Sequence, residues 1–232
     1  MIKVIPADQR HSQDFGWLKT NWLFSFDSYY DPSNMNFGTL RVFNDDVVAP
    51  GGGFPTHSHA EMEIVTVVLS GALTHTDSMG NKAAIRAGDV QRMTAGTGVR
   101  HSEFNFENEP VHLYQIWIMP GQHRLTPSYA QRTMQVSDYK NRLWAVASND
   151  TSLANTVFLN TDATIYMSDF DAGHVHEFKS DPERRLFLYL TSGDLDVNGV
   201  ALHTNDQARI EGEPVLKIGA NSASKFIVVE VP

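Results

Sequence analysis

The sequence predicts an all-β protein made of two tandem antiparallel β-barrel domains. Two observations carry this prediction. Short runs of alternating apolar and polar residues are separated by turn residues, and the pattern of the first half of the chain recurs in the second half. Helical periodicity is weak, and the best helical candidate is a short piece at residues 128–133, directly after Pro127.

The clearest predicted strands alternate in hydrophobicity and end at glycine-bearing or polar turns. In chain order they cover residues 62–69, 111–119, 163–170, 184–190 and 225–231. Strands of this length, repeated with such turns, are typical of β-sandwiches and β-barrels. We therefore expect the strands to build the core without help from helices.

An internal repeat orders these strands into two copies. "LSGALTHTDSMGN" corresponds to "TSGDLDVNGVAL", "RAGDVQRMTAGTGV" to "HTNDQARIEGEPVL", and "LYQIWIMP" to "KFIVVEVP". The offset between copies falls from 122 residues at Gly71/Gly193 to 112 at Pro120/Pro232, so the second copy has shorter hairpins. We expect an amino-terminal domain at residues 1–125 and a carboxyl-terminal domain at residues 126–232, joined within "MPGQHRLTPSYAQR".

Composition excludes several classes of protein. With 41% hydrophobic and 19% charged residues, the 232-residue chain has the composition of a folded globular protein. A net charge of −9 and scattered basic residues disfavour direct binding of nucleic acid. The absence of cysteine excludes disulfides, zinc thiolates and a thiol nucleophile. No apolar stretch is long enough for a membrane span or a signal peptide, so we expect a cytoplasmic protein.

Two histidine pairs are candidates for metal binding. His57 and His59 lie two residues apart, as do His174 and His176. Because about 0.4 such pairs arise by chance in a chain of this composition, the pattern alone is weak. Residues two apart on a strand point to the same side, and "TAGTGVRHSEFN" supplies a second same-sided pair, His101 and Glu103. Three imidazoles and a carboxylate would suit iron(II), manganese, nickel, copper or zinc.

The spacing of these residues resembles the two sequence motifs of the cupin superfamily. The first runs from Gly51 through the histidine pair to Glu63, with Gly71 one residue late, and the second has Ala95 in place of the usual proline. More narrowly, "FGTLRVFNDDVVAPGGGFPTHSHAEMEIVTVVLSG" followed by "AGDVQRMTAGTGVRHSEFN" and "LYQIWIMP" resembles the pirin family, in its bacterial quercetinase-like branch. The resemblance is dense over residues 15–120 and loose but collinear thereafter.

The pirin resemblance implies a jelly-roll-like bicupin fold and a specific set of metal ligands. In this sequence the ligands fall on His57, His59, His101 and Glu103. They would hold one divalent transition metal per chain, with iron(II) as the first choice and nickel, manganese, cobalt, copper or zinc as alternatives. The general cupin pattern nominates Glu63 instead of Glu103. We favour Glu103 and expect Glu63 to orient a histidine or to face the pocket.

The second copy lacks a counterpart of the second pair, because its matching turn reads "IEGEPVLKI". We therefore expect a degenerate, metal-free carboxyl-terminal cupin domain. In that domain His174 and His176 should be exposed or hydrogen-bonded rather than ligating.

The same resemblance implies an oxidoreductase of the quercetin 2,3-dioxygenase type. Its substrates would be dioxygen and a flavonol-like aromatic enol, with release of carbon monoxide. Glu103 would be the catalytic residue, serving as both ligand and proton acceptor. The alternative is a metal- or redox-responsive co-regulator that binds other proteins, so a protein partner stays possible.

Two structural features would separate these alternatives. A deep cavity that ends at the metal would favour catalysis, and a broad apolar patch on the second domain would favour protein binding. In either case we expect a monomer.

Other aromatic and histidine residues have simpler interpretations. The cluster Trp17, Trp22, Phe24, Phe26, Tyr29 and Tyr30 is expected to pack in the core and at the domain seam rather than to form a substrate platform. His75 and His112 are expected to be strand residues, with a place in the cavity lining as the alternative for either. Gly96 and Gly98 are expected to form a turn with positive φ.

Overall fold

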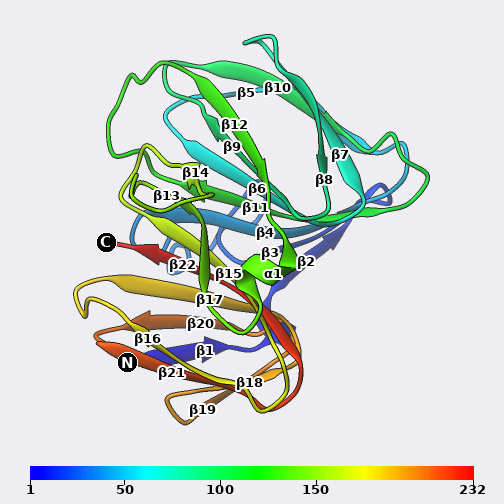
Figure 1. The fold of residues 1–232 in the computed structure, drawn as a ribbon. Helices are drawn as coiled ribbons and strands as arrows, with labels where there is room; N and C mark the ends of the chain where they lie inside the picture. Colours follow the sequence, from blue (N-terminus) through cyan, green and yellow to red (C-terminus); the bar gives the residue numbers. More distant parts are fainter. The chain divides into compact units, whose positions relative to one another are not determined.

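The computed structural model describes residues 1–232, and the chain divides into two compact units that are discontinuous in sequence (Figure 1). The amino-terminal unit comprises His11–Met134 and Asn149–Asp162. The carboxyl-terminal unit comprises Met1–Arg10, Gln135–Ser148 and Ala163–Pro232. The boundary between residues 125 and 126, which was inferred from the internal repeat, stays a prediction.

The elements of the amino-terminal unit are almost all strands. They are β2 (His11–Asp14), β3 (Leu18–Trp22), β4 (Leu40–Val48), β5 (Gly53–His59), β6 (Glu63–Ser70), β7 (Ala72–Asp77), β8 (Lys82–Arg86), β9 (Asp89–Thr94), β10 (Val99–Phe104), β11 (Val111–Ile118), β12 (Ser128–Thr133) and β14 (Val157–Phe158).

The carboxyl-terminal unit adds two very short helices to its strands. It contains β1 (Ile2–Ile5), a 3₁₀ turn (Ala7–Gln9), α1 (Val136–Tyr139), β13 (Trp144–Ser148), β15 (Thr164–Phe170), β16 (Val175–Lys179), β17 (Arg185–Ser192), β18 (Asp194–Val197), β19 (Val200–His203), β20 (Gln207–Glu211), β21 (Val215–Ala220) and β22 (Ser224–Val231). No helix of the chain has the length and apolar character that a membrane span requires.

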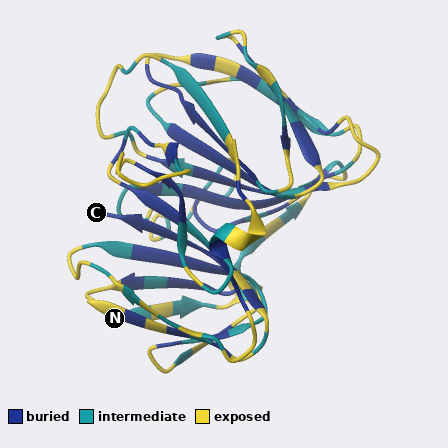
Figure 2. Cartoon of the chain, in the orientation of Figure 1, coloured by how far each residue is buried: buried dark blue, intermediate teal, exposed yellow.

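Two antiparallel sheets form the amino-terminal unit. One follows the order β12-β9-β6-β11-β4-β3-β2 and the other the order β5-β10-β7-β8. Apolar side chains of both sheets meet in a shared core: Leu73 and Ile85 come from the smaller sheet, and Val68, Val111 and Leu113 from the larger. The central strands β6, β9 and β11 are accordingly largely buried, whereas many of the connecting turns are exposed (Figure 2).

The carboxyl-terminal unit repeats this plan, which confirms the bicupin fold. Its larger sheet contains the order β1-β20-β17-β22-β15-β13, and its smaller sheet has the order β16-β21-β18-β19. The hairpin β18–β19 turns at Asn198 and Gly199, both with positive φ, where the first unit has a longer turn. Each unit therefore pairs two open sheets in jelly-roll fashion rather than closing into one barrel.

The expected helix at residues 128–133 is wrong, because this segment is strand β12. It pairs with β9 from Ser128↔Thr94 to Thr133↔Asp89. The hydroxyl of Thr133 donates to Asp89 Oδ1 at 2.5 Å, and the Gln131 amide donates to Asp89 Oδ2 at 2.8 Å. These cross-strand bonds and the open edge of β9 override a weak local preference. The α-helix begins three residues later and is one turn long.

Candidate metal centre

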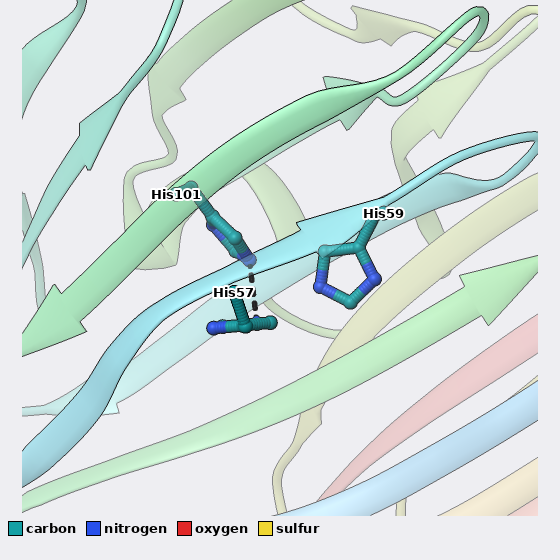
Figure 3. Close-up of side chains that lie close together, drawn as sticks. All are labelled: His57, His59 and His101. Atoms are coloured by element: carbon teal, nitrogen blue, oxygen red, sulfur yellow. Dashed lines mark hydrogen bonds between the residues drawn. The ribbon is translucent and has the colours of Figure 1, made fainter.

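Strands β5 and β10 bring the three histidines of the sequence motifs together (Figure 3). The two strands are antiparallel, with His101 directly opposite His57 and Val99 opposite His59. Gly53 permits the close approach of the strands, because a Cβ atom there would collide with the backbone of Glu103 and Phe104. Gly96, with φ of 45°, makes the turn before β10, where a side chain would meet the Leu125 carbonyl.

The nitrogen donors of the three rings converge on one point. His57 Nε2 and His101 Nε2 lie 3.0 Å apart, and one donor atom from each of His57, His59 and His101 lies within 4.8 Å of the others. Burial, followed by the charge of His57, lowers the pKa of His59 to about 4 and that of His101 to about 2. Both rings are therefore neutral near pH 7, which is the form that binds a metal ion.

Strand β7 places a second histidine and a carboxylate behind His101. His75 and Asp77 face Glu103 and His101, respectively, across the β7–β10 pair. His101 Nδ1 lies 3.4 Å from His75 Nδ1, and His75 Nε2 lies 3.0 Å from Asp77 Oδ2. Although burial raises the pKa of Asp77, hydrogen bonds from Asn81, His75 and Met79 lower it overall, so Asp77 is a carboxylate.

These partners fix the protons on the rings and test whether a cation fits. The Pro55 carbonyl, 2.8 Å from His57 Nδ1, can only accept, so this contact uses the Nδ1 proton and directs Nε2 into the cluster. Asp77 accepts from His75 Nε2, so His75 Nδ1 accepts from His101 Nδ1 and leaves the lone pair of His101 on Nε2. In the metal-free chain a proton on His57 Nε2 can be donated to His101 Nε2, and a metal ion would take the place of that proton. Two nitrogens about 2.1 Å from one ion and at right angles would lie about 3 Å apart, so the observed spacing fits.

Glu103 lies next to His101 and forms a second group with His101 and His75. One carboxylate oxygen of Glu103 and donor nitrogens of His75 and His101 lie within 4.8 Å of one another. The side chain is buried, and Gln115 Nε2 donates to Glu103 Oε2 at 3.3 Å. Burial, followed by the charge of Asp46, raises the pKa of Glu103 to about 7. A metal ion at the histidines would favour its charged form.

The three histidines line a cavity of about 630 Å³ in the amino-terminal unit. Its wall is mainly aromatic. The cavity is lined by Phe15, Trp17, Leu18, Trp22, Phe26, Asp27, Asn44, Asp46, Phe54, Pro55, Thr56, His57, His59, His101, Glu103, Gln115 and Trp117. A concave, largely apolar site with a few polar groups is typical of a small-molecule pocket.

Half of the aromatic cluster that was expected to pack in the core and at the domain seam also lines the cavity. Trp17, Trp22 and Phe26 belong to its lining, although Trp22 is buried and Trp17 packs against the core of the amino-terminal unit. Phe24 is fully buried as expected, whereas Tyr30 is exposed. Periodicity alone did not separate the two roles, because the cavity wall and the core lie on the same apolar face of the larger sheet.

Glu63 does not line the pocket. The expectation that it would orient a histidine or face the pocket is therefore wrong. Glu63 Oε2 accepts a hydrogen bond from the backbone of Asn160 at 3.1 Å, and the Arg92 guanidinium lowers a pKa that burial raises. Glu61, with φ of 52°, turns the chain between β5 and β6. The alternation from His59 therefore does not continue to Glu63.

The carboxyl-terminal unit has no equivalent cluster. His176 on β16 lies opposite Ile218 on β21, whereas His57 on β5 lies opposite His101 on β10. An apolar side chain therefore stands where the amino-terminal unit has a histidine. The ring of His174 packs edge-on against Phe170, with 4.6 Å between ring centroids. Neither histidine has an acidic or imidazole partner from the neighbouring strand.

Two tandem jelly-roll units, with a histidine cluster in the lining of one cavity, define a bicupin with one candidate metal centre. The Pirin family model matches residues 5–118, and the model of the quercetinase C-terminal cupin domain matches residues 145–231. The chain belongs to the pirin family.

Full-length relatives share about two-fifths of the sequence. The chain is 41% identical over 230 residues to a pirin-like protein of Caulobacter vibrioides, with 99% of each chain covered. It is 41% identical over 235 residues to quercetin 2,3-dioxygenase of Escherichia coli K12, covering 100% of this chain and 99% of the relative. The crystal structure of the E. coli pirin YhhW in complex with nickel(II) superposes with a TM-score of 0.94 at 39% identity, covering 100% and 99% of the two chains.

Proposed function

We propose that this protein is a metal-dependent oxidoreductase of the quercetin 2,3-dioxygenase type. It would add dioxygen to a flavonol-like enol and release carbon monoxide. The observation that carries the proposal is the largely aromatic cavity of about 630 Å³, whose lining includes three histidines and Glu103. Its size suits a planar aromatic molecule. The name of the E. coli relative, quercetin 2,3-dioxygenase, supports the same reaction class.

We assign His57, His59, His101 and Glu103 as the ligands of one divalent transition metal per chain. Iron(II) is our first choice. Nickel is supported by the nickel complex of the E. coli pirin, and manganese, cobalt, copper and zinc suit the same nitrogen and oxygen donors. When bound, the ion supplies Lewis-acid stabilisation of the substrate enolate and promotes its reaction with dioxygen.

Glu103 serves as the proton acceptor of the reaction. The buried Glu103 carboxylate lines the cavity and can take the proton of the enolic hydroxyl. Gln115 holds one of its oxygens, which leaves the other to receive this proton. The two ring bonds to the hydroxyl-bearing carbon then break, and that carbon leaves with its oxygen as carbon monoxide. The two atoms of dioxygen end in the ester carbonyl and the carboxyl group of the product, and the proton returns from Glu103 to that carboxylate.

The aromatic wall positions the substrate and excludes water. Trp17, Trp22 and Phe26 offer ring faces and edges to a planar substrate. Because the lining is largely apolar, binding of the neutral flavonol displaces water from the cavity. A cavity lined by the histidines is the feature that favours catalysis over a role confined to binding other proteins. We further propose that the enzyme acts as a cytoplasmic monomer.

The decisive experiment is metal analysis of anaerobically purified protein, followed by turnover assays. Metal-free protein is reloaded separately with iron(II), nickel, manganese, cobalt and copper and mixed with a flavonol in air-saturated buffer. Consumption of one dioxygen and release of one carbon monoxide per flavonol would support the proposal. If none of the loaded forms consumes dioxygen or releases carbon monoxide, the enzymatic proposal is wrong.

A further inference from the structure

Two buried polar side chains on β4 line the cavity beside Glu103 and Gln115. Asn44 and Asp46 are each only 3% exposed, and both belong to the cavity wall. Burial raises the pKa of the Asp46 carboxyl group, and a hydrogen bond from the Thr20 hydroxyl, opposite Asp46 on β3, offsets part of this rise. Asn44 Oδ1 and Asp46 Oδ1, however, have no hydrogen-bond partner within the chain. Buried acceptors without a donor are costly, so an unpaired oxygen on each of two neighbouring side chains indicates that a donor arrives from outside the chain.

The strand register explains why these two residues share the cavity. Asn44 and Asp46 are two residues apart on β4, so both point to the same face, whereas Asp45 points to the other face and bonds to His112 at 2.6 Å. Across the β4–β11 pair, Asn44 lies opposite Gln115. Because Gln115 donates to Glu103, a polar strip runs from the proposed base to Asn44 and Asp46.

We propose that Asn44 and Asp46 form a second recognition point, which accepts a hydrogen bond from a phenolic hydroxyl group of the substrate. The site would therefore select aromatic enols that carry at least one further hydroxyl over those that carry only the enolic one. This inference rests on the proposed function, because it assigns the substrate class of that same cavity. Asn44 and Asp46 are specificity-determining residues rather than catalytic ones.

The charges of the cavity support a neutral hydroxyl donor. The lining includes three carboxyl groups, Asp27, Asp46 and Glu103, and no lysine or arginine. An anionic ligand would be repelled, whereas a phenol offers a donor without a negative charge. Asp46 is buried, and burial raises the pKa of its carboxyl group to about 7, so a neutral donor is accommodated there more readily than an anion.

The test measures ligand selectivity without turnover. Nickel-loaded protein, kept free of dioxygen, is titrated with quercetin and with the parent flavonol, which has only the enolic hydroxyl. Quenching of the cavity tryptophans reports binding. We expect the wild type to bind quercetin at least about tenfold more tightly than the parent flavonol, which is the effect of leaving one buried acceptor unpaired. In Asp46→Leu, and in Asn44→Leu, the ratio should fall to within about threefold.

Two further variants complete the experiment. Asp46→Asn keeps an acceptor oxygen and should retain part of the selectivity, and it replaces Asp46→Leu if that variant does not fold. Asp45→Asn is the matched control on the opposite face of the same strand and should keep the wild-type ratio. A wild-type ratio near one, or an unchanged ratio in folded Asp46→Leu and Asn44→Leu, would overturn the inference.

The result is independent of the turnover assay. Selective binding of quercetin by a protein that consumes no dioxygen would support the recognition point and refute the proposed reaction. Equal binding and equal turnover of both flavonols would refute the recognition point and leave the reaction in place.

Discussion

His57 Nε2 and His101 Nε2 face each other at 3.0 Å, because the Nδ1 atom of each ring is engaged by another partner, the Pro55 carbonyl and His75 Nδ1, respectively. Both Nε2 atoms are therefore directed at one point, where a proton or a metal ion can bind between them. The apolar strands, rather than the ion, hold this arrangement in place, because the rings sit on paired strands of a sheet with its own core.

Replacing any one of His57, His59 or His101 by alanine should abolish stoichiometric metal binding and leave the β fold intact. Each replacement removes one of the converging nitrogen donors without disturbing the core between the sheets. Elemental analysis and far-ultraviolet circular dichroism measure the two effects. His112→Ala is the matched control, because His112 bonds to Asp45 and does not line the cavity. Metal at about one per chain in all three variants would place the site elsewhere.

His75 and Asp77 should act as positioning residues for His101. His75→Phe removes the acceptor that orients the His101 ring, and Asp77→Asn weakens the bond that fixes the proton of His75, so metal affinity should fall by about 10- to 100-fold while all proposed ligands remain. Competition with a chromophoric chelator measures this affinity. The pair His203 and Asp194, 2.9 Å apart in the carboxyl-terminal unit, offers a control: His203→Phe should leave the affinity unchanged. An unchanged affinity in His75→Phe would exclude the positioning role.

The local pattern predicted the histidines but not the strand behind them. Alternation places His57 with His59 and His101 with Glu103, because side chains two apart share a face. The role of His75 depends on the order β5-β10-β7, in which strands distant in sequence become neighbours. "HTD" in β7 shows the same spacing of His75 and Asp77, but nothing local indicates which strand it will face. Glu63 was misplaced because the turn at Glu61 resets the alternation.

The pair His174 and His176 should prove irrelevant to metal binding. The double variant His174→Ala/His176→Ala should keep both the metal content and any dioxygenase activity, because β21 presents Ile218 where β10 presents His101. The measurement is elemental analysis alongside the oxygen-consumption assay. Loss of a second equivalent of metal would show that the carboxyl-terminal unit is not degenerate.

Asp46 should make the stability of the metal-free protein depend on pH. The pKa of Asp46 in the folded chain, about 7, exceeds its ordinary value of 3.8, so the folded state binds more protons than the unfolded state between these pH values. The free energy of unfolding should therefore fall as the pH rises from about 4 to about 7. Asp46→Asn lacks this effect, and at pH 8 its advantage over the wild type should be at most about 4 kcal/mol, at about 1.4 kcal/mol per pKa unit.

Urea unfolding at pH 4.5 and pH 8 tests this prediction. The advantage of Asp46→Asn should be small at the lower pH and larger at the higher one. Asp45→Asn should show no such gain, because it weakens a hydrogen bond to His112. An advantage of equal size at both pH values would mean that Asp46 titrates normally in the folded chain.

Glu103→Gln should separate catalysis from binding. The substitution keeps the shape of the side chain and removes the anionic proton acceptor, so activity with a flavonol should fall by about 10²- to 10⁴-fold. Glu63→Gln should be milder, because Glu63 bonds to Asn160 and does not line the cavity. The comparison requires protein samples matched for metal content, since lost occupancy would otherwise be mistaken for lost chemistry. If metal-matched Glu103→Gln retains the wild-type rate, another group accepts the enolic proton, and the role of Glu103 is at most that of a ligand.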